Sequence, residues 1–123
     1  MGDSQSALRL TTYVNAFPVV AAYEGVIIHS RFTSGAPIND ESWIMGATPT
    51  RIRDDAPRPV LQLQTEAEVA LDLEWLQPGL GTWAAVRQPN AGNVHTWEVA
   101  GASHADKYLL TSAGATTGLD ISG

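Results

Sequence analysis

Apolar and polar positions first follow a helical spacing along the chain. Between residues 7 and 14 the apolar side chains recur three and four positions apart, which predicts a helix ending near Asn15. Pro18 follows too closely for this helix to continue far. Residues 17–25 allow a short second turn that closes at Gly25.

Three later runs have the pattern of strands. Residues 25–32 (GVIIHSRF) form a β-branched apolar run typical of a buried strand, residues 58–66 (RPVLQLQTE) start a second, and residues 93–101 (NVHTWEVAG) alternate as a third. Residues 70–77 fit either a helix or a wall segment, and residues 103–110 predict a last short helix. Strands alternating with connections predict an α/β fold: a small parallel sheet of about three strands with flanking helices.

The chain of 123 residues fits one domain, which we place over residues 1–123. Proline, glycine and asparagine interrupt every periodicity between residues 33 and 59, so this segment is predicted to be a long loop or lid-like segment. The glycine- and threonine-rich residues 112–123 are predicted to form a frayed tail.

Composition then indicates which partners, cofactors and cellular compartment to expect. Seven Lys and Arg against thirteen Asp and Glu give a net charge of −6, and without an extended basic stretch we expect no nucleic-acid partner. The apolar runs are too short for a membrane span, and no basic and apolar leader opens the chain, so we expect a cytoplasmic protein. Without cysteine, and without paired histidines at ligand spacing, we expect no metal and no cofactor.

Candidate chemistry begins at the second residue, where Gly2, Ser4 and a small residue form a Gly-x-Ser-x-small turn. A serine hydroxyl becomes a nucleophile when a histidine takes its proton and a carboxylate orients that histidine. Glu66 and Glu68 both follow the second predicted strand, and His104 follows the third. The candidate acids and the histidine therefore all fall at carboxyl ends of strands, where open α/β sheets place their functional groups.

Three stretches in this order resemble the C-terminal half of an α/β-hydrolase: G-D-S-Q-S-A, P-V-L-Q-L-Q-T-E-A-E and W-E-V-A-G-A-S-H-A-D. More narrowly, S-Q-S-A-x-R-L-T-T-Y-V-N-A, G-A-P-I, T-P-T-R-I-R-D-D and A-G-x-x-H-A-D resemble a bacterial group of α/β-hydrolase-domain proteins. The resemblance runs from about Gly2 to Leu110 and implies a partial α/β-hydrolase fold. The family's earlier strands, including the one that holds the nucleophile turn, would lie upstream of Gly2.

The resemblance implies a role for each matching residue. Ser4 matches the nucleophile and His104 the general base, while the backbone N–H of Gln5 would donate to the oxyanion. Glu68 matches the acid, with Glu66 as the runner-up. The implied activity is hydrolysis of a small apolar carboxylic ester through an acyl-enzyme.

Two further expectations concern binding. Trp43, in the long predicted loop, is the candidate wall for an apolar acyl group, with packing of the core or lid as the alternative. The open edge of strand 25–30 is expected to pair with another copy, which predicts a homo-oligomer that completes the sheet. The alternative to an esterase is a non-catalytic fragment derived from a hydrolase, serving as a binding or oligomerisation module.

Overall fold

The computed structural model describes residues 1–18, 22–38, 48–76, 78–105, 108 and 110–112. Its elements in chain order are β1 (Gly2–Asp3), α1 (Gln5–Ala16), β2 (Val26–His29), β3 (Val60–Thr65), α2 (Glu66–Ala70), the 3-10 turn η1 (Trp83–Val86) and β4 (Val94–Val99). Within these described residues, no helix has the length and apolar character needed to cross a membrane.

The strands form one parallel sheet in the order β1-β2-β3-β4. The predicted α/β class is confirmed, with four strands rather than about three. The additional strand is β1, which pairs Gly2 with Ile28 and Asp3 with His29. A strand of two residues is too short to show an alternating pattern, so no local signal indicated it. The expectation that the supporting strand lies only upstream of Gly2 is wrong, because β1 directly precedes Ser4.

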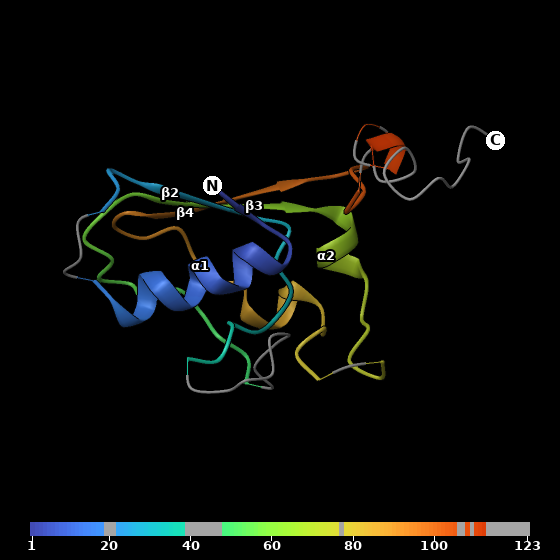
Figure 1. Ribbon diagram of the computed structural model, residues 1–123, viewed down its shortest axis with the longest axis horizontal. Helices are drawn as coiled ribbons and strands as arrows, with labels where there is room; N and C mark the ends of the chain where they lie inside the picture. Colours follow the sequence, from blue (N-terminus) through green and yellow to red (C-terminus); the bar gives the residue numbers. More distant parts are fainter. Residues whose placement is uncertain (19–21, 39–47, 77, 106–107, 109, 113–123) are drawn as a thin grey trace.

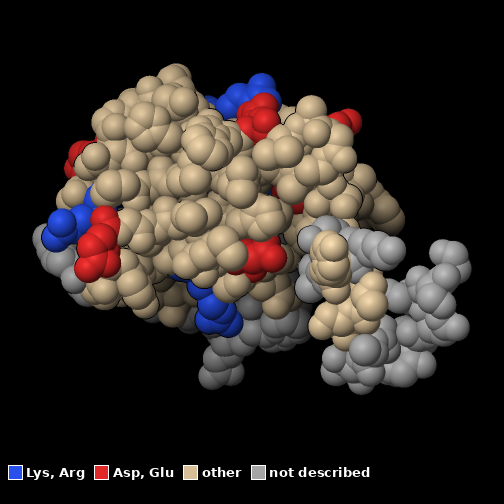
Figure 2. Space-filling view, turned by 90° about the horizontal axis from the view of Figure 1, so that it is seen from above, with Lys and Arg blue, Asp and Glu red and all other residues tan. Residues whose placement is uncertain are grey.

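The helices α1 and α2 and the turn η1 lie on one side of the sheet, as Figure 1 shows. The core lies between the sheet and α1, and it consists of Ala7, Val14, Ile28, Ile52, Ala56, Val60 and Val94. Side chains one position along each strand point to the opposite face, where Ile27, Trp97 and Val99 are exposed. Figure 2, seen from that side, shows a largely uncharged surface.

Two predicted connections differ from the structure. The helix after β3 covers Glu66–Ala70 rather than residues 70–77, because a capping box between Thr65 and Glu68 starts it directly at the end of the strand. No helix occurs in the described residues 17–18 and 22–25, where a second turn was expected. Near the end of the chain, Tyr108 and residues 110–112 are helical.

The predicted loop is present in the parts of 33–59 that the structure describes, where residues 33–38 and 48–59 contain neither helix nor strand beyond a bridge between Ser34 and Pro49. Ile52 and Ala56 from this segment are buried in the core. Its lid-like role and the single-domain organisation stay predictions. Of the tail predicted to fray, residues 113–123 lie outside the described residues.

Strand 25–30, which was expected to pair with another copy, does not form the edge of the sheet. β2 lies between β1 and β3, so only the Val26–Ile27 part of the strand lacks a partner on the β1 side. On β1, the N–H of Asp3 donates to the Ser6 hydroxyl (3.0 Å), and the same hydroxyl donates to the Asp3 carbonyl (2.6 Å). Self-association stays a prediction, and strand pairing at Asp3 would have to displace Ser6.

Gly2 permits the close approach of β1 and α1. A Cβ built on Gly2 would lie 2.8 Å from the backbone oxygen of Ser6. We therefore expect Gly2→Ala to destabilise the fold by about 1–3 kcal/mol, the usual cost of overpacking. Urea unfolding measures this as a lower midpoint, and an unchanged midpoint would show that strand and helix tolerate the extra methyl group.

Candidate active site

Ser4 occupies the sharp turn between β1 and α1. Its φ of 52° and ψ of −117° place it in a left-handed conformation that non-glycine residues rarely adopt. The Ser4 N–H donates to the carbonyl of His29 on β2 (3.1 Å), while its carbonyl accepts from Ala7 and Leu8 in the first turn of α1. The strained turn is thus held by the sheet on one side and the helix on the other.

His104 lies beyond the end of β4 and faces this turn. Its Nε2 is 3.2 Å from the Ser4 hydroxyl, and its Nδ1 is 2.5 Å from Oε1 of Glu68. With Nδ1 as the donor to Glu68, Nε2 is left to accept from Ser4. The Phe32 ring packs against the imidazole with 5.7 Å between ring centroids. The structure therefore brings together three side chains that are far apart in the sequence.

Glu68 is fully buried in α2 and has both carboxylate oxygens occupied. While Oε1 accepts from His104, Oε2 accepts from the backbone N–H of Thr65 (2.8 Å) and from its hydroxyl (2.6 Å). The contact with the Thr65 N–H is one half of the capping box that begins the helix, and in the other half the Thr65 side chain accepts from the backbone N–H of Glu68. The T-x-x-E spacing is the sequence signal that separates this glutamate from its neighbour, and sequence reasoning missed it.

Glu66, the alternative acid, contacts main chain instead of the imidazole. Its Oε2 accepts a hydrogen bond of 2.6 Å from the backbone N–H of Gly101. Gly101 has a φ of 75°, a conformation that suits glycine. Glu66 therefore ties the turn that leads to His104 to the start of α2, and of the two glutamates only Glu68 contacts the imidazole in the structure.

The hydrogen bond between His104 and Glu68 shifts the pKa of both groups. It raises the pKa of His104 above its ordinary value, against the opposing effect of burial, and the negative charges of Glu68 and Asp3 act in the same direction. Burial opposes ionisation of Glu68, but hydrogen bonds from His104 and Thr65 outweigh it and lower the pKa of the carboxyl. The arrangement keeps Glu68 ionised and favours a proton on the imidazole.

A comparison with models of protein families shows which family this chain belongs to. The model of a family described as an alpha/beta hydrolase domain matches residues 1–121. The chain belongs to this alpha/beta hydrolase family. Searches of curated proteins and of solved structures gave no match. Membership confirms the resemblance drawn from the three motifs and establishes a hydrolase-like fold.

Gln5 is the first residue of α1, next to Ser4. The first N–H groups of a helix have no partner within it, and they lie at the positive end of its dipole. Among the described residues no hydrogen bond from the Gln5 N–H is recorded. A partly negative oxygen bound at Ser4 would meet this free donor.

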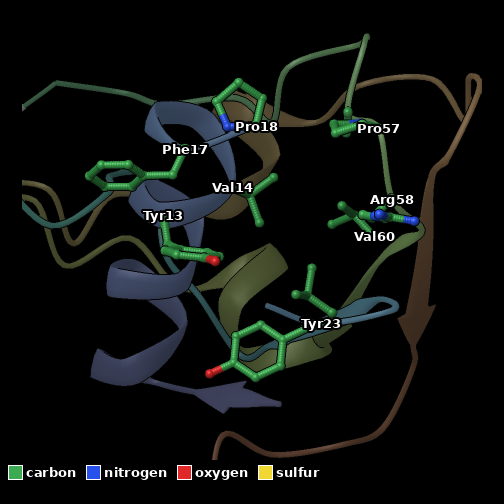
Figure 3. A pocket seen from close by; sticks show the side chains of 10 residues that line it. Tyr13, Val14, Phe17, Pro18, Tyr23, Pro57, Arg58 and Val60 are labelled. Atoms are coloured by element: carbon green, nitrogen blue, oxygen red, sulfur yellow. The ribbon is translucent and has the colours of Figure 1, made fainter. Parts of the chain in front are cut away.

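Other candidate residues lie elsewhere. Trp43 falls outside the described residues. An apolar pocket is lined by Tyr13 and Phe17 near the end of α1 and by Val60 at the start of β3 (Figure 3), so it lies at the opposite end of the helix and sheet from Ser4. Within the part of the chain that is described, no group of three or more His, Asp or Glu side chains is placed to hold a metal ion.

Proposed function

We propose that this alpha/beta hydrolase is a serine hydrolase that cleaves carboxylic esters through an acyl-enzyme on Ser4. The observation that carries the proposal is the continuous chain of contacts from Ser4 to His104 to Glu68, at 3.2 and 2.5 Å. A serine, a histidine and a buried carboxylate in this order are the groups that activate a hydroxyl for attack. The left-handed turn at Ser4 further supports it, because it presents the hydroxyl between a strand and a helix.

Acylation begins when the Ser4 oxygen attacks the ester carbonyl carbon. Its proton passes to Nε2 of His104 as the new C–O bond forms and the carbonyl electrons move to the oxygen. The N–H of Gln5 donates to that oxyanion. The intermediate then expels the alcohol, which leaves with the proton from Nε2, and the acyl group remains on Ser4.

Deacylation repeats these steps with water. His104 removes a proton from the water as its oxygen attacks the acyl carbon, and a second tetrahedral intermediate forms. Its collapse breaks the bond to Ser4, returns the proton to the serine and releases the carboxylic acid. Through both halves Glu68 stays ionised, holds the Nδ1–H tautomer and stabilises the imidazolium.

The residues described around Ser4 offer little apolar surface for a long acyl chain. A hollow open to solvent is lined by residues 3–6 and Arg9. Phe32 adds an apolar ring beside His104. We therefore propose a short-chain ester as substrate, with Trp43 as a further apolar wall.

A non-catalytic binding module is the alternative, and one observation favours it. Trp97 is 64% exposed on the side of the sheet opposite α1 and α2, with Ile27 and Val99 on the same face. Parallel sheets are usually covered on both faces. A module that binds through this face would need no reactive serine, so reactivity at Ser4 separates the two functions.

Labelling with a fluorophosphonate tests the proposal directly. We expect the folded protein to react at Ser4, shown by mass spectrometry of the labelled peptide, because His104 activates that hydroxyl. Since His104 must be neutral to accept the proton, labelling should fall as the pH drops through its raised pKa.

Two controls define the outcome of the labelling experiment. Urea-unfolded protein should not react, and Ser112→Ala should react like the unmodified protein, because Ser112 is an exposed serine and the hydroxyl that His104 contacts is that of Ser4. A folded protein that takes no label, or takes it at a serine other than Ser4, would favour the binding module.

A further inference from the structure

A second contact between a histidine and a carboxylate lies beside Ser4. Nδ1 of His29, at the end of β2, is 2.9 Å from Oδ1 of Asp3, at the end of β1. Nε2 of His29 is 3.2 Å from the hydroxyl of Ser30. The backbone carbonyl of His29 accepts a hydrogen bond from the N–H of Ser4. His29 therefore contacts both the proposed nucleophile and the residue before it.

This second cluster repeats the order of the first but has a different use. Ser30 has a φ of 52°, the same as Ser4, and its hydroxyl also meets an imidazole that contacts a carboxylate. Ser30 is 0% exposed, so no ester can reach its hydroxyl. Nδ1 of His29 lies close to Oδ1 of Asp3, but among the described residues this oxygen accepts no directed hydrogen bond. The cluster is thus placed to support the site rather than to react.

Asp3 is the member of this cluster that reaches the proposed catalytic groups. It directly precedes Ser4, and Ser6 holds its main chain through both its N–H and its carbonyl. Its charge acts with that of Glu68 to raise the pKa of His104. The other charged group at this hollow is Arg9 on α1.

We propose that Asp3 and His29 are positioning residues: His29 holds the Asp3 carboxylate beside the nucleophile turn, where it places a second negative charge at the hollow that contains Ser4. The carboxylate touches neither the substrate carbonyl nor the transferred proton in this scheme. It stabilises the charge that appears on His104 as Ser4 attacks. This inference rests on the proposed function for its catalytic meaning, but the coupling between Asp3 and His104 is measurable without catalysis.

NMR titration of the histidine rings in the full-length protein tests that coupling. We expect Asp3→Asn to move the titration midpoint of His104 to lower pH, because one of the charges that favour the protonated ring is removed. Added salt should reduce the difference between the two proteins, since the Asp3 side chain is 44% exposed. Asp55→Asn, which removes an exposed carboxylate paired with Arg53, should leave His104 unchanged.

Variants of His29 test whether it acts through Asp3. His29→Asn keeps an amide nitrogen near the position of Nδ1 and should preserve the titration midpoint of His104. His29→Ala should move that midpoint to lower pH, in the same direction as Asp3→Asn. In the Asp3→Asn background, His29→Ala should have no further effect, which a double-mutant cycle measures. Asp3→Asn alone keeps the test decisive if His29→Ala does not fold.

Activity supplies the second readout. With a short p-nitrophenyl ester, Asp3→Asn should lower kcat/KM up to about 5-fold, the scale of a partly exposed charge interaction, and move the acidic limb of its pH profile downward. An identical His104 titration in Asp3→Asn and the unmodified protein overturns the inference, even if Ser4 is labelled. A shifted titration without labelling of Ser4 overturns the proposed function and leaves the coupling standing.

Discussion

Replacing Ser4 by alanine should lower kcat for a short p-nitrophenyl ester by about 10⁶-fold, the usual cost of removing the nucleophile of a serine hydrolase. No other described hydroxyl contacts His104, so the variant has no substitute from which the acyl-enzyme can form. The measurement is the release of p-nitrophenol, corrected for hydrolysis in buffer. Turnover close to that of the unmodified protein would contradict the mechanism.

His104→Ala should produce a loss of similar size, because Ser4 and His104 act as one unit. For the same reason the double variant should be hardly slower than either single variant. His95→Ala is the matched control: His95 is exposed on β4 and should be dispensable for turnover. Circular dichroism of each variant separates a lost side chain from a lost fold.

Strands were predictable from the sequence where they were long enough to have a pattern. β2, β3 and β4 contain four to six residues each, and their apolar or alternating runs were located correctly. β1 consists of two residues, Gly2 and Asp3, and exists because it pairs with β2. Pairing of this kind depends on the tertiary structure, so no local pattern predicts it.

The positions of the candidate site were predictable in part. The sequence placed the glutamate and the histidine at carboxyl ends of strands, and the structure adds β1 before Ser4, so parallel pairing brings all three groups to one edge of the sheet. The contacts of Asp3 with His29 depend on the register of β1 and were beyond the sequence. Also unforeseen was Arg31, which is buried with Gln62 and the Thr50 carbonyl as partners, and burial lowers its pKa to about 10.

Glu68→Gln is the most specific test of the proposed acid. The carboxylate accepts three hydrogen bonds, one from His104 on Oε1 and two from Thr65 on Oε2. Glutamine has only one oxygen, so its NH₂ group must face a donor on one side. We expect kcat to fall by about 10⁴-fold, as when a triad carboxylate becomes an amide, and the acidic limb of kcat/KM to move to lower pH because His104 loses the bond that raises its pKa.

Glu66→Gln is the matched control for activity. Its amide oxygen can still accept from the N–H of Gly101, so we expect turnover to be largely kept.

The variants Glu68→Gln and Glu66→Gln also separate an effect on rate from an effect on stability. Glu68→Gln should cost about 1–3 kcal/mol for a buried donor left without its acceptor. The folded state lowers the pKa of Glu68, so this stabilisation is present above the pKa of the unfolded chain and is lost as the pH falls through the folded value. Urea midpoints of the variant and the unmodified protein should therefore converge in acid. If Glu66→Gln instead abolished turnover and Glu68→Gln did not, Glu66 would be the acid and the contact in α2 only a helix cap.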